Sequence, residues 1–292
     1  MGKLAHLVCN AFIEAKDKEA KASFLSFLPK KQADLYSSLY LPSLDLKSGF
    51  NLTDHLLQST HYTWFTPFFR TLVENQIKLF LSALPNETAE KLQETLLIQG
   101  KLPEISPLAK SFLQNKLKKI LLADKPDLLP IEALPESPLN VLLNIQIKEL
   151  RLLIEFLGLH DLAIEIKQII DTVKLKKIQS ILSKEKAFFL QLLSHKKESV
   201  VFKKMQLSNW DGETDLLIKL LQKRGMNRLA KALFPEDPNL VWYIQHQLSN
   251  EESLLFSSLH KKLEQPKAYS LLADQIIEIL AFFQKHKIQV DP

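Results

Sequence analysis

Glycine is scarce in this sequence. The 292 residues include only 6 glycines, about a third of what an average usage of roughly 7% would give. They stand singly, so the chain offers no glycine-rich turn of the kind that holds a nucleotide phosphate. Valine is also sparse beside leucine, isoleucine, lysine and glutamine, and this bias favours helices over strands. The glycines are Gly2, Gly49, Gly100, Gly158, Gly212 and Gly225.

Cysteine and long uncharged apolar runs are also nearly absent. Cys9 is the single cysteine, which excludes an intramolecular disulfide and makes a reducing compartment the default. Residues 139–159 are about as long as a membrane span, but charged side chains interrupt them, so we expect a buried helix and no direct membrane insertion. The charged residues in this stretch are Lys148, Glu149, Arg151 and Glu155.

No motif of a catalytic or metal centre occurs. His55 and His61 are six positions apart, which on a helix places them on opposite sides, and the chain has no His-Glu-x-x-His or Cys-x-x-Cys spacing. Cys9 could be paired with His6 as a nucleophile, but a small packed thiol is the favoured interpretation. We therefore expect a protein that is not an enzyme, with no catalytic residue, no cofactor and no metal ion.

The charge pattern is mildly basic. The net charge is +5, and the lysine pairs are dispersed with acidic residues between most of them. Nucleic-acid binding would require a concentrated basic stripe, so a solvated surface is the favoured interpretation and no nucleic-acid partner is expected.

Proline suggests how the chain is divided. Four of the 14 prolines lie between Asp124 and Pro138, and none lies between Pro138 and Pro235. Because proline interrupts helices, the first stretch predicts a linker and the second predicts nearly continuous helix. The predicted parts are an N-terminal helical repeat domain at 1–124, a proline-rich linker at 125–138, middle armadillo-like helices at 139–205 and a C-terminal helical domain at 206–292.

Helical periodicity and a short repeat define the expected fold class. Apolar residues in the final segment recur at the spacing of one helix face, and alternation typical of strands is nowhere sustained. A Phe-Leu-Ser-x-Leu-Pro element occurs at residues 24–29 and again at 80–85, each followed by a new helix start. Such short helices favour an all-α, armadillo-like right-handed superhelix, although chance similarity remains an alternative explanation of the repeat.

An aromatic cluster spans residues 64–69. A helix beginning at Pro67 would turn Phe68 and Phe69 toward the core and leave Trp64 and Phe65 in the preceding turn. Trp64 and Phe65 therefore predict either a hydrophobic staple or an aromatic anchor for a protein partner.

The C-terminal segment carries a family resemblance from Trp210 to Val290. It contains a leucine-rich helix at 215–224, a Leu-Ala-x-Ala-Leu element at 229–233, a Leu-Ser helix start at 248–253, and a long final helix that includes residues 273–280. In this order the segment resembles the C-terminal domain of FliG, the flagellar motor-switch protein family. The Leu-Ser-x-Leu-Pro sequence pattern at 81–89 is similar to that of the armadillo repeats of that family.

The resemblance implies an adaptor role without torque generation. Where the family carries Asp-Asp-Arg, then Arg-Glu and Asp, this chain has Glu213, Thr214 and Asp215, then Gln222, Lys223 and Gly225. The resemblance therefore implies a FliG-like protein that works without a stator, as in a non-flagellar type III secretion system.

The implied role is a non-catalytic scaffold that links a membrane ring to a cytoplasmic ring, with components of those rings as partners. Its implied location is cytoplasmic, peripheral to the inner membrane through those partners. A generic helical-repeat scaffold unrelated to secretion is the alternative, and an unrecognised enzyme or nucleic-acid binder is a third class.

The expected partner surface is the helix at 215–224 and the turn after it. Leu216, Leu217, Leu220 and Leu221 should face the core, and the basic residues should remain outside for an acidic partner segment. A solvated helix face is the competing interpretation. The predicted partner-binding basic residues are Lys219, Lys223, Arg224 and Arg228.

Overall fold

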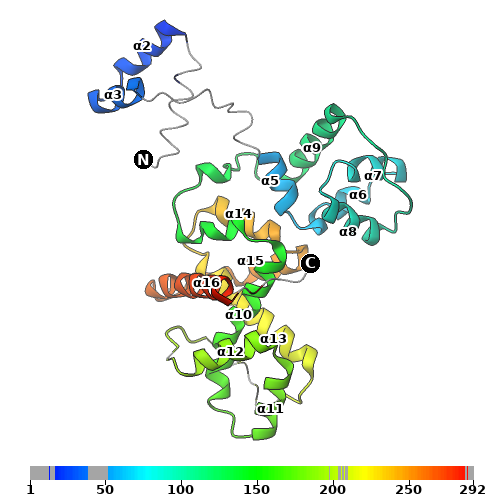
Figure 1. Ribbon diagram of the computed structural model, residues 1–292, viewed down its shortest axis with the longest axis vertical. Helices are drawn as coiled ribbons and strands as arrows, with labels where there is room; N and C mark the ends of the chain where they lie inside the picture. The colour runs from blue at the N-terminus through cyan, green and yellow to red at the C-terminus, as the bar shows by residue number, and fades with distance from the viewer. Residues whose placement is uncertain are drawn as a thin grey trace.

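The protein is all-helical, as predicted. The computed structural model describes residues 13, 17–38, 52–196, 198–202, 205, 207, 210–286 and 288. Within these residues every regular element is an α-helix or a short 3-10 helix, and none is a strand. Cys9 and His6 lie outside the described residues. Two N-terminal helices are drawn apart from the others in Figure 1, α2 (Lys18–Ser26) and α3 (Lys30–Ser38).

Several helices begin where the local sequence predicts. Ser249 and Glu252 form the predicted capping box: the Ser249 hydroxyl accepts from the Glu252 amide at 3.2 Å, and the Glu252 carboxylate accepts from the Ser249 amide at 2.8 Å. Ser183 caps the helix that begins at Lys184, and its hydroxyl accepts from the Lys186 amide at 3.3 Å. Both Leu-Pro elements are followed by a new helix, α3 at Lys30 and α8 at Asn86.

A small lobe is built from residues 52–121. Its core joins Leu57, Phe65 and Phe69 to apolar side chains from the helices that follow, including Leu92 and Leu117. Figure 1 shows α6 to α9 as a group beside the main body. The helices of this lobe are α5 (Leu52–Ser59), η1 (Tyr62–Trp64), α6 (Thr66–Phe69), α7 (Glu74–Leu81), α8 (Asn86–Leu96) and α9 (Pro107–Leu121).

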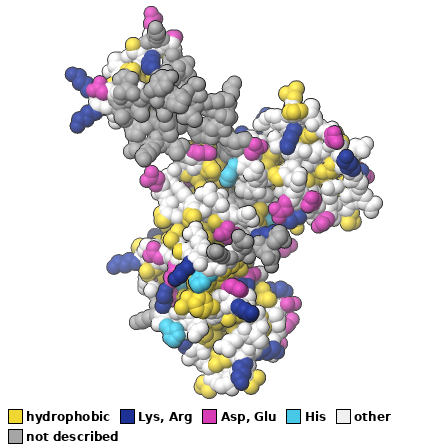
Figure 2. All heavy atoms as spheres, in the orientation of Figure 1, with side chains coloured by type: hydrophobic (Ala, Val, Ile, Leu, Met, Phe, Trp, Pro, Cys, Tyr) yellow, Lys and Arg dark blue, Asp and Glu magenta, His cyan; other side chains and the backbone are white. Residues whose placement is uncertain are grey.

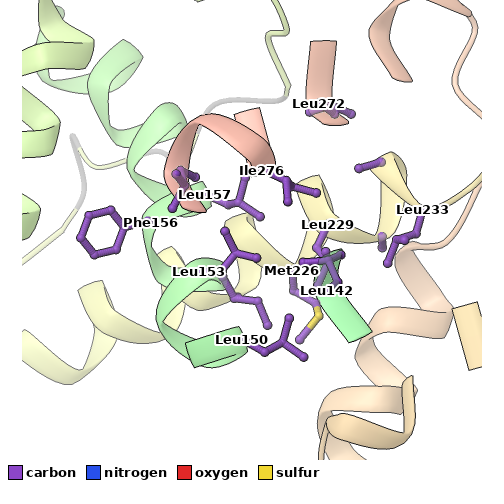
Figure 3. Close-up of a cluster of buried hydrophobic side chains, with 14 of the residues drawn as sticks. Leu142, Leu150, Leu153, Phe156, Leu157, Met226, Leu229, Leu233, Leu272 and Ile276 are labelled. Atoms are coloured by element: carbon purple, nitrogen blue, oxygen red, sulfur yellow. The ribbon is translucent and has the colours of Figure 1, made fainter. Parts of the chain in front are cut away.

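The main body has one continuous apolar core that contains Leu56 of α5 and side chains from residues 128–283. Figure 3 shows side chains of α10, α13 and α16 meeting there, among them Leu153, Met226 and Ile276. The elements of the body are η2 (Ile131–Ala133), η3 (Pro138–Asn144), α10 (Ile147–Ile166), α11 (Thr172–Ile181), α12 (Lys184–Ser194), α13 (Thr214–Ala232), α14 (Pro238–Gln247), α15 (Asn250–Leu259) and α16 (Lys267–His286).

The proline-rich segment packs onto this body. Leu128 and Leu134 are buried in the main core. The Tyr243 hydroxyl donates to the Leu129 carbonyl at 2.7 Å, and the Leu129 amide donates to Asn239 Oδ1 at 3.3 Å. Residues 125–138 are thus attached to α14. Side chains on both sides of residue 206 also share the one core, since Leu153 and Met226 belong to it.

Helices α10 and α13 cross in backbone contact because each has a glycine at the crossing. A Cβ atom built on Gly225 would lie 1.6 Å from the Ile154 carbonyl oxygen, and one built on Gly158 would lie 2.2 Å from the Leu221 carbonyl oxygen. No other residue leaves room for so close an approach. These glycines set the separation of the two helices at the centre of the protein.

Several polar contacts attach the small lobe to the C-terminal helices. The His61 amide donates to the His246 carbonyl at 2.7 Å, Trp64 Nε1 donates to the Leu248 carbonyl at 2.9 Å, and the Asn250 amide donates to Thr63 Oγ1 at 3.1 Å. Residues almost two hundred positions apart in the sequence therefore form the junction of lobe and body.

Candidate partner-binding site

Arg228 is inside the protein, and its predicted place on an exposed partner surface is wrong. Its side chain is 0% exposed. Helix α13 does not end at Arg224 but continues to Ala232, so no turn follows residue 224. The continued helix turns residue 228 toward α10 and α16 because it lies seven positions after the buried Leu221.

A buried polar network surrounds the Arg228 guanidinium. Its Nη2 donates to Asp161 Oδ1 at 2.6 Å and to the Val200 carbonyl at 3.0 Å, and its Nη1 donates to Gln275 Oε1 at 2.9 Å. Glu198 lies 3.5 Å from Nη1. The network joins α10, the segment after α12, α13 and α16, so its role is to hold the body together.

The two carboxylates of the network differ in their environment. Burial raises the pKa of Asp161, and the nearby charge of Arg228 opposes that effect. Burial would also raise the pKa of Glu198, but the hydrogen bond from His160, at 2.7 Å, and the charges of His160 and Arg228 lower it to about 2. Glu198 is therefore ionised at neutral pH and is the more persistent counterion.

The outward face of α13 carries two of the predicted basic residues. Lys219 and Lys223 are exposed and lie on one side of the helix, whereas Leu217 and Leu221 are buried, as predicted. Leu216 was predicted to face the core, but its side chain is 40% exposed. It lies on the opposite side of the helix from the contact with α10.

Lys219 and Lys223 border a hollow of about 280 Å³ between α10, α13 and α15, which we call the α13 hollow. Apolar side chains of all three helices line it, and so do Arg151 and Glu252, which form an ion pair at 3.3 Å. The lining residues are Arg151, Ile154, Lys219, Gln222, Lys223, Met226, Glu252 and Leu255.

Arg224 lies outside this hollow. Its side chain is half-buried, and its charge opposes the burial that raises the pKa of Asp161. Of the four predicted basic residues, the structure brings only Lys219 and Lys223 together at the hollow. Arg151 of α10 joins them, and no pattern in the sequence pointed to this residue, because α10 is distant from α13 along the chain.

Trp64 and Phe65 both make contacts inside the protein. Phe65 is fully buried in the core of the small lobe, so it cannot serve as an exposed anchor. The half-buried Trp64 ring stacks on His246 with 4.0 Å between ring centroids, and its indole nitrogen binds the Leu248 carbonyl. Trp64 therefore attaches the small lobe to α14, and Phe65 packs within the lobe itself.

A second, larger cleft of about 690 Å³ lies between the small lobe and the body, and we call it the polar groove. Residues of α5 and α8 form one wall, and the end of η3 and the start of α10 form the other. Arg151 stands where this groove approaches the α13 hollow, with its Nη2 atom 3.1 Å from His61 Nε2.

Neither a metal cluster nor a membrane span is found among the described residues. No group of three or more His, Cys, Asp or Glu residues in this part of the chain could hold a metal ion. No described helix is long and apolar enough to cross a bilayer. Figure 2 shows acidic and basic side chains interspersed on the face in view.

Comparison with protein-family models, with curated proteins and with solved structures gave no match to this chain.

Proposed function

We propose that the protein is a non-catalytic helical scaffold that binds an acidic protein segment in the α13 hollow. The observation that carries this proposal is the position of Lys219 and Lys223 beside the apolar surface of Ile154, Met226 and Leu255. An apolar floor with a cationic rim suits an amphipathic segment whose acidic side chains meet the lysines.

The hollow is preorganised on its α10 side. Arg151 contacts both Glu252 and His61, at 3.3 and 3.1 Å, so its guanidinium is oriented before a partner arrives. Lys219 and Lys223 remain exposed on the opposite side. A partner therefore meets one oriented cation and two exposed ones, an arrangement that favours fast association at low salt.

We further propose a FliG-like adaptor role in a type III secretion or flagellar-type apparatus, between its membrane ring and its cytoplasmic ring. The support for this role is the resemblance of residues 210–290, together with the all-helical architecture, and an armadillo-like stacking of the helices is part of the same proposal. A general helical scaffold outside secretion is the second candidate, and the α13 hollow is its supporting observation as well.

The test reverses the charge of Lys219 and Lys223 by replacing both with glutamate. In the Lys219→Glu/Lys223→Glu variant we expect recovery of the partner to fall by about ten-fold or more, because the rim then repels an acidic segment. Lys110→Glu/Lys176→Glu is the matched control, since both lysines are exposed, lie on other helices and stand outside the hollow.

The partner is identified by photo-crosslinking from position 222 in the native host, followed by mass spectrometry. Crosslinks to membrane-ring or cytoplasmic-ring proteins support the adaptor role, and crosslinks to unrelated proteins favour the general scaffold. Equal recovery by wild type and the Lys219→Glu/Lys223→Glu variant, with unchanged melting, refutes the α13 hollow as a binding site.

A further inference from the structure

An apolar groove of about 450 Å³ opens on the small lobe between the end of α6, α7 and α9, and we call it the lobe groove. Two of its aromatic rings, Phe68 and Phe80, meet edge to face with 5.2 Å between their centroids. The rest of the lining is Gln76, Lys116 and Lys119. The apolar lining residues are Phe68, Leu72, Leu79, Phe80, Leu113 and Ile120.

The groove is formed before any partner arrives. Gln114 Nε2 donates to the Ala83 carbonyl at 3.1 Å, which ties α9 to the chain just after α7. The groove is also open to solvent, because Leu79 in its wall is 42% exposed. Beside it, Phe112 is 59% exposed, and Lys116 Nζ lies 5.0 Å from the centroid of its ring. Exposed apolar side chains gathered in a recess are typical of an interaction site.

The charge around the lobe groove has one sign. Helix α9 contains four lysines and no acidic residue. Within the part of the chain that the structure describes, neither Lys116 nor Lys119 forms an ion pair. The acidic residue of α7, Glu74, is bound to Lys78 at 2.7 Å, on the side of the helix away from the groove. The two lysines of the rim therefore keep their charge available for an acidic partner.

The shape of the groove selects among acidic partners. A recess lined by apolar side chains accepts side chains that project from a partner, and an amphipathic helix presents such side chains in a row at positions i, i+3 or i+4, and i+7. Acidic residues beside that row would lie against Lys116 and Lys119. A flat lipid surface would leave the recess unfilled.

We infer that the lobe groove binds an acidic amphipathic helix of a partner protein. Apolar side chains of that helix fill the recess over Phe68 and Phe80, and its carboxylates meet Lys116 and Lys119. In Figure 1 the lobe that carries α7 and α9 lies to the side of the main body, whereas α13 belongs to the body. The groove is therefore a docking surface separate from the α13 hollow, and the inference goes beyond the function proposed for that hollow.

The experiment selects displayed amphipathic helical peptides, with random apolar anchors and random flanking charges, on the full chain and measures the affinity of the enriched ones by calorimetry. Lys116→Glu/Lys119→Glu should weaken the acidic peptides by about ten-fold or more, because the rim then repels them. Leu79→Gln should also weaken them, because it removes apolar contact at an exposed position. Lys110→Glu/Lys176→Glu is the matched control, since both lysines are exposed and stand outside the groove.

The outcomes separate the two proposals. Acidic peptides that lose affinity in both groove variants and bind the Lys219→Glu/Lys223→Glu variant normally support the lobe groove. Failure to enrich such peptides, or equal binding by wild type and the groove variants, overturns it. Without such peptides, binding to phosphatidylserine vesicles or self-association that is lost in Lys116→Glu/Lys119→Glu would assign the surface to a membrane or to a second copy. The α13 hollow is judged separately, by the loss of its crosslinked partner in the Lys219→Glu/Lys223→Glu variant.

Discussion

Replacing Gly225 by alanine should destabilise the protein, although alanine is the better helix former. In an isolated helix this change stabilises by about 1 kcal/mol, because glycine has the greater backbone freedom to lose. Here the added methyl group would lie 1.6 Å from the Ile154 carbonyl oxygen. Contacts below 3.0 Å are essentially never made by a Cβ atom, so α10 and α13 must move apart by more than 1 Å.

The size of the effect follows from what the helices hold together. Moving them apart loosens the packing of Leu153 and Leu157 against Met226 and Leu229, all buried at the crossing (Figure 3). Overpacking a core typically costs about 1–3 kcal/mol, and backbone cannot yield by changing rotamer. We therefore expect a net loss near the upper end, about 3 kcal/mol.

The assay is urea unfolding followed by circular dichroism at a helix-sensitive wavelength. Gln222→Ala, an exposed position on the same helix, is the control and should stay within about 0.5 kcal/mol of wild type. Gly158→Ala should behave like Gly225→Ala, because its methyl group meets the Leu221 carbonyl at 2.2 Å. A Gly225→Ala variant as stable as wild type, or more stable, would refute the backbone contact.

Two further predictions concern buried charge. Arg228→Met should lower the free energy of unfolding by about 3–5 kcal/mol, because it removes the guanidinium that pairs with Asp161 and Glu198. Lys223→Met is the control and should be nearly neutral. A loss below about 1 kcal/mol for Arg228→Met would contradict the network. Burial lowers the pKa of His246 from 6.5 to about 4, so the unfolded chain binds more protons between these values, and this one group should reduce the free energy of unfolding by roughly 3 kcal/mol as the pH drops from 7 to 4. His246→Phe should remove this contribution, whereas the separate loss from His61, whose pKa burial also lowers to about 4, should remain; an unchanged pH profile would show that His246 is not the titrating group.

Local features of the fold could be predicted from the sequence. The Ser249–Glu252 capping box and the helix starts after Pro29 and Pro85 depend on contacts a few residues apart, and the structure contains all three. The buried apolar face of α16, with Leu272, Ile276, Ile279, Leu280 and Phe283, also follows from spacing alone.

The candidate site was only half predictable. Lys219 and Lys223 follow from their place on a helix face, but their partner in the hollow, Arg151, belongs to a helix about seventy positions earlier in the chain. The polar groove left no signal in the sequence, because its walls come from residues 55–95 and 143–151 and from Gln247 of α14, which are distant from one another in the chain.

The sequence alone therefore determined the helical class and where many helices begin, since propensity, capping and proline act within one or two turns. Only the tertiary structure decided which polar side chains face inward. Arg228 is a surface residue by chemistry, yet α13 continues past Arg224 and carries it into the body, where Asp161 and Gln275 from two other helices compensate its burial. Burial of a charge depends on partners that are distant in the chain, so no local pattern could reveal it.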